Sequence, residues 1–329
     1  MAPPPIEILD GELHVPGSAL YLDARRRTRC AFVSHAHGDH IARHDRTIAT
    51  HATAALTLHR LGGKVRGEIL PAEYRVPFGL GDLTVELFPA GHVLGSAQIR
   101  VARKGQALCY TGDLCLEPTL TAEPAEVAPC DVLVMESTFG LPRYVFPPKE
   151  VVLREIRGFV DDALSDGATP VLLAYALGKG QEILKYLGEA GYPCRAHPVV
   201  HAVDRVYERL GVSLPNVRLL GAEGPERGEV VVAPPHLARS SAIQRIRRRR
   251  TAVLTGWAVE GGRFRWRGVD ASFPLSDHAD FPALLRYARA TGARRVYTLH
   301  GYAEELARAL RREGLRAEPL ESARQLELL

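Results

Sequence analysis

The sequence predicts an α/β protein in which a β-rich α/β domain is interrupted by a second α/β domain. The first 140 residues consist of short apolar segments separated by turn residues, which is the signal of strands. From about residue 149 onward, apolar runs alternate with segments of helical spacing, which is typical of parallel α/β units. We therefore assign residues 1–140 and 266–329 to the first domain and residues 141–265 to the inserted domain.

The predicted strands of the first part are short apolar runs bounded by Gly, Pro or Asp. They cover residues 6–9, 19–22, 29–34, 83–88, 98–102, 107–113 and 131–138. Several of them lead directly into polar or histidine-bearing loops, so functional groups are expected where these strands end.

The later elements follow from the change in periodicity. Apolar residues at helical spacing, stopped by glycine, predict helices over 149–167 and 179–191. Apolar runs predict strands over 169–175, 230–235, 251–257 and 294–300. Two further helices, over 281–292 and 303–314, flank the last of these strands.

The composition is that of an ordinary globular protein, with 46% hydrophobic and 24% charged residues among 329. No stretch approaches the roughly 18 uninterrupted apolar residues of a membrane span. The N-terminus lacks the basic start and apolar run of a secretory signal, so we expect a cytoplasmic protein that does not contact a membrane. A net charge of +4 suits an anionic partner.

The five cysteines argue against a disulfide framework and against a cysteine zinc site. Their number is odd, their spacing is irregular and no CxxC pair occurs. We expect reduced, mostly buried thiols at Cys30, Cys109, Cys115, Cys130 and Cys194.

The segment SHAHGDH is the strongest chemical signal in the chain. It follows the apolar run CAFV, at the point where a predicted strand opens into a loop. Residues two apart in an extended segment face the same side, so His35 and His37 can point at one metal. Asp39 and His40 can reach a second metal. Imidazole and carboxylate without thiolate suit Zn²⁺, with Mn²⁺ as the alternative.

Two more groups complete such a site. His92 lies in a glycine-flanked loop after the predicted strand 83–88, and Asp113 ends the predicted strand 107–113. Alone, a single histidine or a strand-end aspartate is usually structural. Beside SHAHGDH, they are expected to be a third ligand of the first metal and a carboxylate that bridges both metals. Two metals about 3.5–4 Å apart favour in-line displacement at phosphorus.

These motifs resemble a known family. HAHGDH, GHVLGS and TGD look like the first ligand motifs of the metallo-β-lactamase superfamily, and the remainder is similar to its β-CASP nucleases, which process DNA or RNA ends. The further matches are ESTFG with Glu136, LSDHAD with His278, LHG with His300, and the cap segments 174–182 and 253–262. The resemblance implies an αββα metallo-β-lactamase sandwich with an inserted α/β β-CASP cap domain.

The resemblance also implies two Zn²⁺ ions per chain, held by seven side chains. The first ion would be bound by His35, His37 and His92, the second by Asp39, His40 and His300, with Asp113 bridging. Asp39 and Asp113 thereby belong to the catalytic set.

Two other catalytic residues are implied. Glu136 would orient a ligand or the motif histidine, as outer carboxylates commonly do. His278 would contact the scissile phosphate or protonate the leaving oxygen. For Asp277 and Asp280 we predict helix capping ahead of the segment FPALLRYA.

Several strings resemble, more closely, the bacterial ligase-associated DNA exonucleases. They include ESTFGLP, AYALGKGQ and LSDHADFPALL. This resemblance implies a DNA exonuclease that trims DNA ends in repair, prefers DNA over RNA, and is functionally associated with an ATP-dependent DNA ligase. His300 points the other way, because a histidine there is typical of the RNA-processing branch.

Three alternatives remain open. The same chemistry on RNA would make the chain an exo- or endoribonuclease. A thioester or lactam hydrolase of this fold would not need an inserted domain of roughly 125 residues, and a non-catalytic scaffold would lack ligands.

Candidate contacts to nucleic acid come from two basic segments. Arg263, Arg265 and Arg267 alternate with aromatic residues, so a strand there would place an arginine face along a phosphodiester backbone. The competing interpretation is a solvated arginine face over aromatic core residues. Lys179, between two glycines, is a second candidate phosphate contact, and His236 lies in a loop of the inserted domain.

Overall fold

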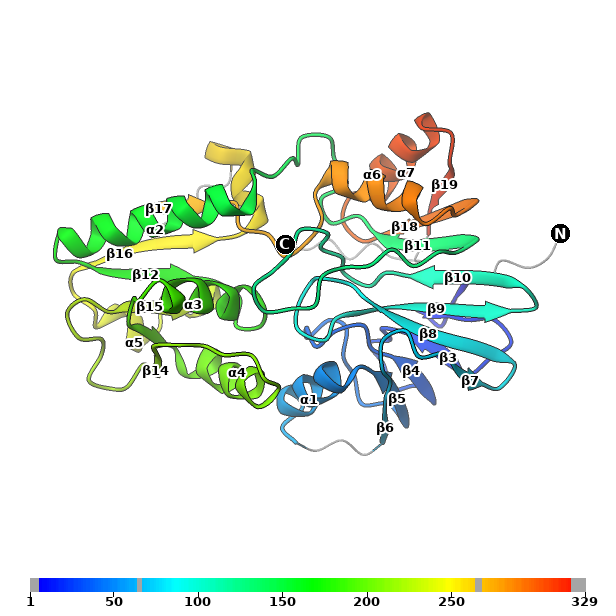
Figure 1. The fold of residues 1–329 in the computed structure, drawn as a ribbon, viewed down its shortest axis with the longest axis horizontal. Coiled ribbons are helices and arrows are strands. Elements are labelled where there is room, and N and C mark those ends of the chain that lie inside the picture. Colours follow the sequence, from blue (N-terminus) through cyan, green and yellow to red (C-terminus); the bar gives the residue numbers. More distant parts are fainter. Residues whose placement is uncertain (1–5, 64–66, 264–267, 321–329) are drawn as a thin grey trace. The chain divides into compact units, whose positions relative to one another are not determined.

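The computed structural model of the chain describes residues 6–63, 67–263 and 268–320. These residues form a mixed α/β structure whose strands build three sheets (Figure 1). The chain divides into two compact units, which are described separately. The first contains the described residues up to 118, 122–142 and those from 278 onward; the second contains 119–121 and the described residues of 143–277.

The first unit contains two sheets and three helices. The first sheet has the order β1-β2-β3-β4-β5-β6, and the second has the order β19-β18-β11-β10-β9-β8-β7. The strands of the first sheet are β1 (Glu7–Leu9), β2 (Glu12–His14), β3 (Leu20–Leu22), β4 (Cys30–Phe32), β5 (Arg46–Ala49) and β6 (Glu68–Pro71). Those of the second are β7 (Phe78–Leu80), β8 (Leu83–Pro89), β9 (Ala97–Arg103), β10 (Gln106–Tyr110), β11 (Val132–Glu136), β18 (Arg295–Leu299) and β19 (Arg316–Pro319).

The two sheets of this unit share one apolar core. Phe32 and Ile48 of the first sheet are packed in it with Ile99 of the second. The other face of the second sheet is covered by α6 (Phe281–Ala290) and α7 (Ala303–Arg312), whose apolar residues form a second core with β10, β11 and β18. Helix α1 (His51–Arg60) contacts β6. This layering places the polar loops after β4, β8 and β10 at neighbouring strand ends.

The second unit is built on one parallel sheet of order β14-β13-β15-β12-β16-β17. Its strands are β12 (Thr169–Leu173), β13 (Cys194–Ala196), β14 (Val217–Leu219), β15 (Val230–Ala233), β16 (Arg249–Leu254) and β17 (Ala271–Phe273). Its helices are α2 (Lys149–Ser165), α3 (Lys179–Glu189), α4 (Pro198–Arg209) and α5 (Ser241–Gln244), with the 3₁₀ turns η1 (Pro235–Leu237) and η2 (Gly256–Arg263).

The two faces of this parallel sheet are covered by different helices. Leu172 and Val232 lie in a core with α2, α3 and α4, whereas Leu173 and Val231 lie in a core with Ile243 of α5. Strands β12 and β15 are neighbours, yet the chain leaves β12 for α3 on one face and leaves β15 for α5 on the other.

The unit boundary differs from the predicted domains at the return point. The second unit begins at residue 143, two residues after the predicted start, but it extends to residue 277 instead of 265. The reason is that β17 pairs in parallel with β16, with Ala252 opposite Ala271, which ties this segment to the second sheet.

Two expectations about the rest of the chain can be compared directly. All five cysteines are buried free thiols, as predicted. None of the helices that the structure describes has the length and the apolar character that crossing a membrane requires.

Candidate metal centre

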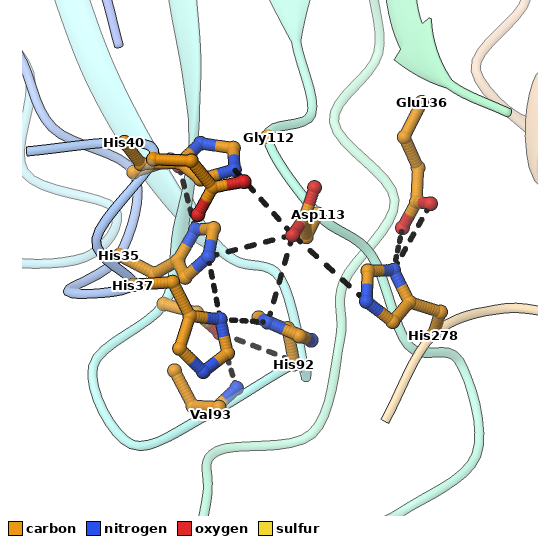
Figure 2. Close-up of polar contacts among 12 residues, drawn as sticks. His35, His37, His40, His92, Val93, Gly112, Asp113, Glu136 and His278 are labelled. Atoms are coloured by element: carbon orange, nitrogen blue, oxygen red, sulfur yellow. Dashed lines mark hydrogen bonds and ion pairs between the residues drawn. The ribbon is translucent and has the colours of Figure 1, made fainter. Parts of the chain in front are cut away.

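Four of the predicted ligands converge in the first unit (Figure 2). Each of His35, His37, His92 and Asp113 offers one donor atom, and these four atoms lie within 4.8 Å of one another. Nδ1 of His37 lies 3.0 Å from Nε2 of His35 and 3.0 Å from Nε2 of His92. Oδ2 of Asp113 lies 3.4 Å from Nε2 of His35 and 3.7 Å from Nε2 of His92.

These spacings suit a tetrahedral cation. Bonds of about 2.0–2.1 Å from zinc to nitrogen or oxygen put neighbouring ligand atoms roughly 3.3 Å apart. The separations of 3.0–3.7 Å between the donor atoms lie around this value. The residues present therefore fit a zinc ion at this position.

Local backbone geometry brings these side chains together. His35 and His37 follow β4, His92 follows β8 and Asp113 follows β10, so each donor stands just beyond a strand end. Gly112 has a φ of +56°, and a Cβ there would lie 2.5 Å from Cβ of Ser34. Only glycine allows the TGD turn to pack against the residue that precedes the histidine motif.

The proposed ligands of a second ion are less tightly grouped. Nε2 of His40 lies 3.6 Å from Oδ2 of Asp113 and 3.7 Å from Oδ2 of Asp39, whose side chain is exposed. The ring of His300 lies 6.2 Å from that of His40, measured between centroids. Within the described ranges, His300 is in no group of three mutually close donor atoms. The structure therefore brings the first set of donors together and leaves His300 at its margin.

A buried carboxylate that the sequence analysis did not single out supports this cluster. Asp23 accepts hydrogen bonds from the Ser34 amide (2.7 Å), the Ser34 hydroxyl (2.6 Å) and the Tyr110 hydroxyl (2.7 Å). Its Oδ2 also lies 2.8 Å from Nδ1 of His40. Asp23 follows the predicted strand 19–22, and this strand-end position, which drew attention to Asp113, is the signal that could have identified it.

Asp23 fixes the orientation of two histidines. Burial alone would lower the pKa of His40, but the carboxylates of Asp113 and Asp23 raise it to about 10. When Nδ1 of His40 donates to Asp23, Nε2 of His40 faces Asp39 and Asp113. Carboxylates behind the ligands of metal sites commonly orient histidine rings in this way. The Ser34 hydroxyl donates to Asp23 and lies 3.0 Å from Nδ1 of His35, so Nε2 of His35 faces the donor cluster.

The surroundings of His35 favour its neutral imidazole. Burial, followed by the charges of neighbouring histidines, holds the pKa of His35 well below its usual value. Burial is also the main cause that raises the pKa of Asp113 to about 6, against the opposing effect of His40 and His278. A bound cation would favour the deprotonated form of each of these groups.

The buried Glu136 and the partly exposed His278 form a pair at the side of the cluster (Figure 2). Nδ1 of His278 lies 3.0 Å and 3.1 Å from the two oxygens of Glu136, and its Nε2 lies 3.9 Å from Oδ2 of Asp113. The Leu114 amide donates to Glu136 (2.6 Å), and the Leu114 carbonyl accepts from the amide of Ala279 (2.6 Å). Burial favours the protonated acid, but His278 and the Leu114 amide lower the pKa of Glu136 overall.

The LHG segment is fixed to the ESTFG segment through the backbone. The hydroxyl of Ser137 donates to the carbonyls of Leu299 and His300, and the amide of Tyr302 donates to the carbonyl of Ser137. Gly301 has a φ of +51°, and a Cβ there would lie 2.4 Å from the Ser137 carbonyl oxygen. His300 itself has a φ of +63° and is an exposed residue, although burial of its ring is the main cause that lowers its pKa to about 4.

The residues predicted to contact nucleic acid lie outside this cluster or outside the described residues. Lys179 is buried and forms an ion pair with Asp277, and the phosphate contact predicted for Lys179 stays a prediction. Asp277 is consequently not a helix cap, whereas Asp280 caps α6 by accepting from the amide of Ala283 (2.9 Å). Arg265 and Arg267 lie outside the described residues, and Arg263 ends η2 without a described side chain.

Comparison with known proteins gives three informative similarities, while no protein-family model matches the chain. A "Probable DNA ligase" of Opitutus terrae is 42% identical over 322 residues, which are 96% of this chain and 31% of that protein. An "RNase aCSPSF2" of Saccharolobus solfataricus is 30% identical over 190 residues, covering 49% of this chain and 38% of the relative. An "RNase J-like protein" of Methanocaldococcus jannaschii is 31% identical over 105 residues, covering 31% of this chain and 25% of the relative.

The chain thus spans between a quarter and two fifths of the length of these relatives. Two of the three are named as ribonucleases, and the third is named as a DNA ligase.

Proposed function

We propose that this chain is a metal-dependent phosphodiesterase that cleaves nucleic acid. The names of its relatives indicate the β-CASP nucleases of the metallo-β-lactamase superfamily, and we propose that the chain is one of them. The observation that carries the proposal is the convergence of His35, His37, His92 and Asp113, with His278 adjoining Asp113. In this proposal the second unit is the β-CASP cap domain.

The donor set would hold two ions, Zn²⁺ with Mn²⁺ as the alternative. His35, His37 and His92 would bind the first ion, Asp39, His40 and His300 the second, and Asp113 would bridge. When bound, such ions stabilise the charge that develops on phosphorus and lower the pKa of the attacking water. The proposal requires His300 to move toward His40 when both bind the second ion, since their ring centroids lie 6.2 Å apart.

The protein's own contribution to the reaction comes from Glu136 and His278. The carboxylate of Glu136 accepts from Nδ1 of His278 and favours the doubly protonated ring. Nε2 of His278 then carries a proton on the side of the ring that faces Asp113. We propose that this proton passes to the leaving oxygen as the P–O bond breaks, so that the product leaves as an alcohol.

RNA is the substrate to which most of the names quoted for the relatives refer. The names "RNase aCSPSF2", "RNase J-like protein" and "Endoribonuclease YSH1" all refer to action on RNA. A histidine at position 300 agrees with the RNA-processing branch that it resembles. RNA cleavage is therefore our first substrate assignment, ahead of the DNA preference predicted from the sequence.

DNA remains a second candidate because of one specific observation. The similarity to the Opitutus terrae protein extends over 96% of this chain at 42% identity, and that protein is named as a probable DNA ligase. A nuclease that trims DNA ends would prepare substrates for such a ligase, so an association with an ATP-dependent DNA ligase stays part of this second proposal.

The deciding experiment is digestion of RNA and DNA oligonucleotides of identical sequence, labelled separately at the 5′ and 3′ ends. Zn²⁺ and Mn²⁺ are each added to metal-free protein, and Asp113→Ala, which removes the bridging carboxylate, is the control. Metal-dependent cleavage by the wild type and none by a folded Asp113→Ala variant is expected. Cleavage of RNA alone or DNA alone assigns the substrate, and cleavage of neither by metal-loaded protein rejects the nuclease proposal.

A further inference from the structure

Tyr175 is a large aromatic side chain left exposed at the carboxyl end of β12. Its exposed fraction is 52%, whereas Ala174 and Leu177 beside it are fully buried. Nζ of Lys179 lies 4.9 Å from the centroid of its ring. Lys179 is itself held by its buried ion pair with Asp277. Its ammonium group therefore lies over the Tyr175 ring from a fixed position, which favours one orientation of the ring.

His236 stands at the end of the neighbouring strand. The amide of Ala174 donates to the carbonyl of Ala233 (3.0 Å), so the last residues of β12 and β15 are level with each other. From there β15 passes through two prolines into η1, on which the side chain of His236 is exposed. Tyr175 and His236 therefore leave adjacent strand ends at the same edge of the parallel sheet.

A third group lies at this edge. His197 follows β13, and its amide donates to the carbonyl of Val232 in β15 (2.8 Å). Burial lowers the pKa of His197, and the nearby charge of His236 lowers it further, which agrees with two imidazoles lying close together. Three consecutive strands, β13, β15 and β12, thus end in His197, His236 and Tyr175.

The connections make this edge a topological switch point. Strand β12 is followed by α3 on one face of the sheet, while its neighbour β15 is followed by α5 on the opposite face. In open parallel sheets the two diverging connections leave a crevice at the carboxyl ends, and ligands bind there. The sheet topology and the exposed aromatic residue point to the same place.

We infer that the carboxyl ends of β12 and β15 form a nucleotide subsite, in which a base of a single strand stacks on Tyr175 and His236 donates a hydrogen bond to the adjoining phosphate. This inference rests on the proposed nuclease function and names a contact for its substrate. Stacking on a tyrosine requires an unpaired base and accepts every base, because each has a π-face. The subsite therefore selects single strands without selecting sequence.

The test measures equilibrium binding of a single-stranded 12-mer to the metal-loaded full chain by fluorescence anisotropy. Phosphorothioate linkages keep the oligonucleotide intact, and a matched set carries one abasic position each. The wild type should bind about ten-fold more weakly when the missing base is at one particular position of the strand, or at either of two adjacent positions. Tyr175→Phe, which keeps the ring, should give the same profile.

Two substitutions then assign the contacts. Tyr175→Ala should bind the unmodified strand about ten-fold more weakly and show no further loss at the sensitive position. His236→Ala should weaken binding to unmodified and abasic strands equally, because it removes a contact to the phosphate and not to the base. Thermal unfolding of each variant confirms that the fold is retained.

The results separate this inference from the proposed function. If the chain cleaves nucleic acid but Tyr175→Ala binds like the wild type, or keeps the position-specific loss, the subsite is wrong and the function stands. If Tyr175-dependent binding is found without any cleavage, the subsite stands and the nuclease proposal fails. No binding of single strands by the wild type overturns the subsite.

Discussion

The ring of His278 is held by both carboxylate oxygens of Glu136, at 3.0 Å and 3.1 Å from the same nitrogen, Nδ1. Glu136 is itself held by the amide of Leu114, whose carbonyl accepts from Ala279, the residue after His278. The histidine is thus fixed through its ring and through the backbone that follows it. In the proposed mechanism, Nε2 of His278 is therefore the atom that carries the transferred proton.

We expect His278→Ala to lower kcat by about 10²–10⁴-fold while the metal content is unchanged. A general acid matters most for a poor leaving group, so an activated p-nitrophenyl phosphodiester should lose much less rate than an oligonucleotide. Metal analysis and kcat on both substrates check this. Loss of metal from the variant would make His278 a ligand and contradict its assigned role.

Glu136→Gln tests the orienting role separately. The amide keeps the shape and can still accept from Leu114, but it loses the charge that favours protonated His278. We expect a smaller loss of kcat than for His278→Ala, and no additional loss when both substitutions are combined. Additive losses in the double variant would show that Glu136 acts independently of His278.

Asp23→Asn should weaken metal binding by about 10–100-fold, the usual effect of removing an outer carboxylate. The reason is that Asp23 orients His40 directly and His35 through Ser34. Competition with a chromogenic chelator measures the affinity. Tyr110→Phe is the matched control, because it removes one hydrogen bond to Asp23 and leaves its contacts to both Ser34 and His40; its effect should be smaller. Equal affinities for wild type and Asp23→Asn would refute the orienting role.

The sequence predicted the donors of the first cluster because strand-end histidines and aspartates are recognisable as a pattern. Asp23 obeys the same pattern but was overlooked, since no neighbouring motif drew attention to it. Lys179 shows the opposite limit: its glycine-flanked position suggested an exposed phosphate contact, but its partner Asp277 is 98 residues away in the sequence. Strand β13 was not predicted, because a run of three residues carries no periodicity of its own, and helix α4 was missed although Val200, Val203 and Val206 have helical spacing.

Lys179→Met should destabilise the protein by about 3–5 kcal/mol, since it leaves the buried carboxylate of Asp277 without its cation. The double substitution Lys179→Met with Asp277→Leu removes both charges and should recover most of the loss. Chemical denaturation gives the free energies of unfolding. A double variant no more stable than Lys179→Met would show that the pair is not the cause.

Asp204 predicts an unusual pH dependence of stability. Burial is the main cause that raises its pKa to about 7, opposed by the side chain of Gln181 and assisted by Glu208. In the described part of the chain its Oδ2 has no hydrogen-bond partner and lies 3.8 Å from Nδ1 of His201. The folded state therefore binds a proton that the unfolded state releases near pH 4, so this contribution to stability is full below pH 4 and is lost as the pH rises to 7.

We therefore expect Asp204→Asn, which keeps the Oδ1 acceptor for Gln181, to stabilise the protein at pH 8 by on the order of 2–4 kcal/mol. At pH 4 the same substitution should change little. Thermal unfolding of both proteins across this range provides the measurement, with Asp166→Asn at an exposed position as the control. Parallel curves for wild type and Asp204→Asn would show that Asp204 titrates normally.

The packing of Gly301 against the Ser137 carbonyl has a consequence for how this chain can diverge. The two residues are 164 positions apart in the sequence, yet the Ser137 carbonyl accepts from Tyr302 and leaves no room for a Cβ at position 301. A side chain at 301 would push the segment that begins at Glu136, and with it the carboxylate that holds His278. Drift at the two motifs is therefore coupled, and homologues that replace Gly301 should carry a compensating change in the ESTFG turn.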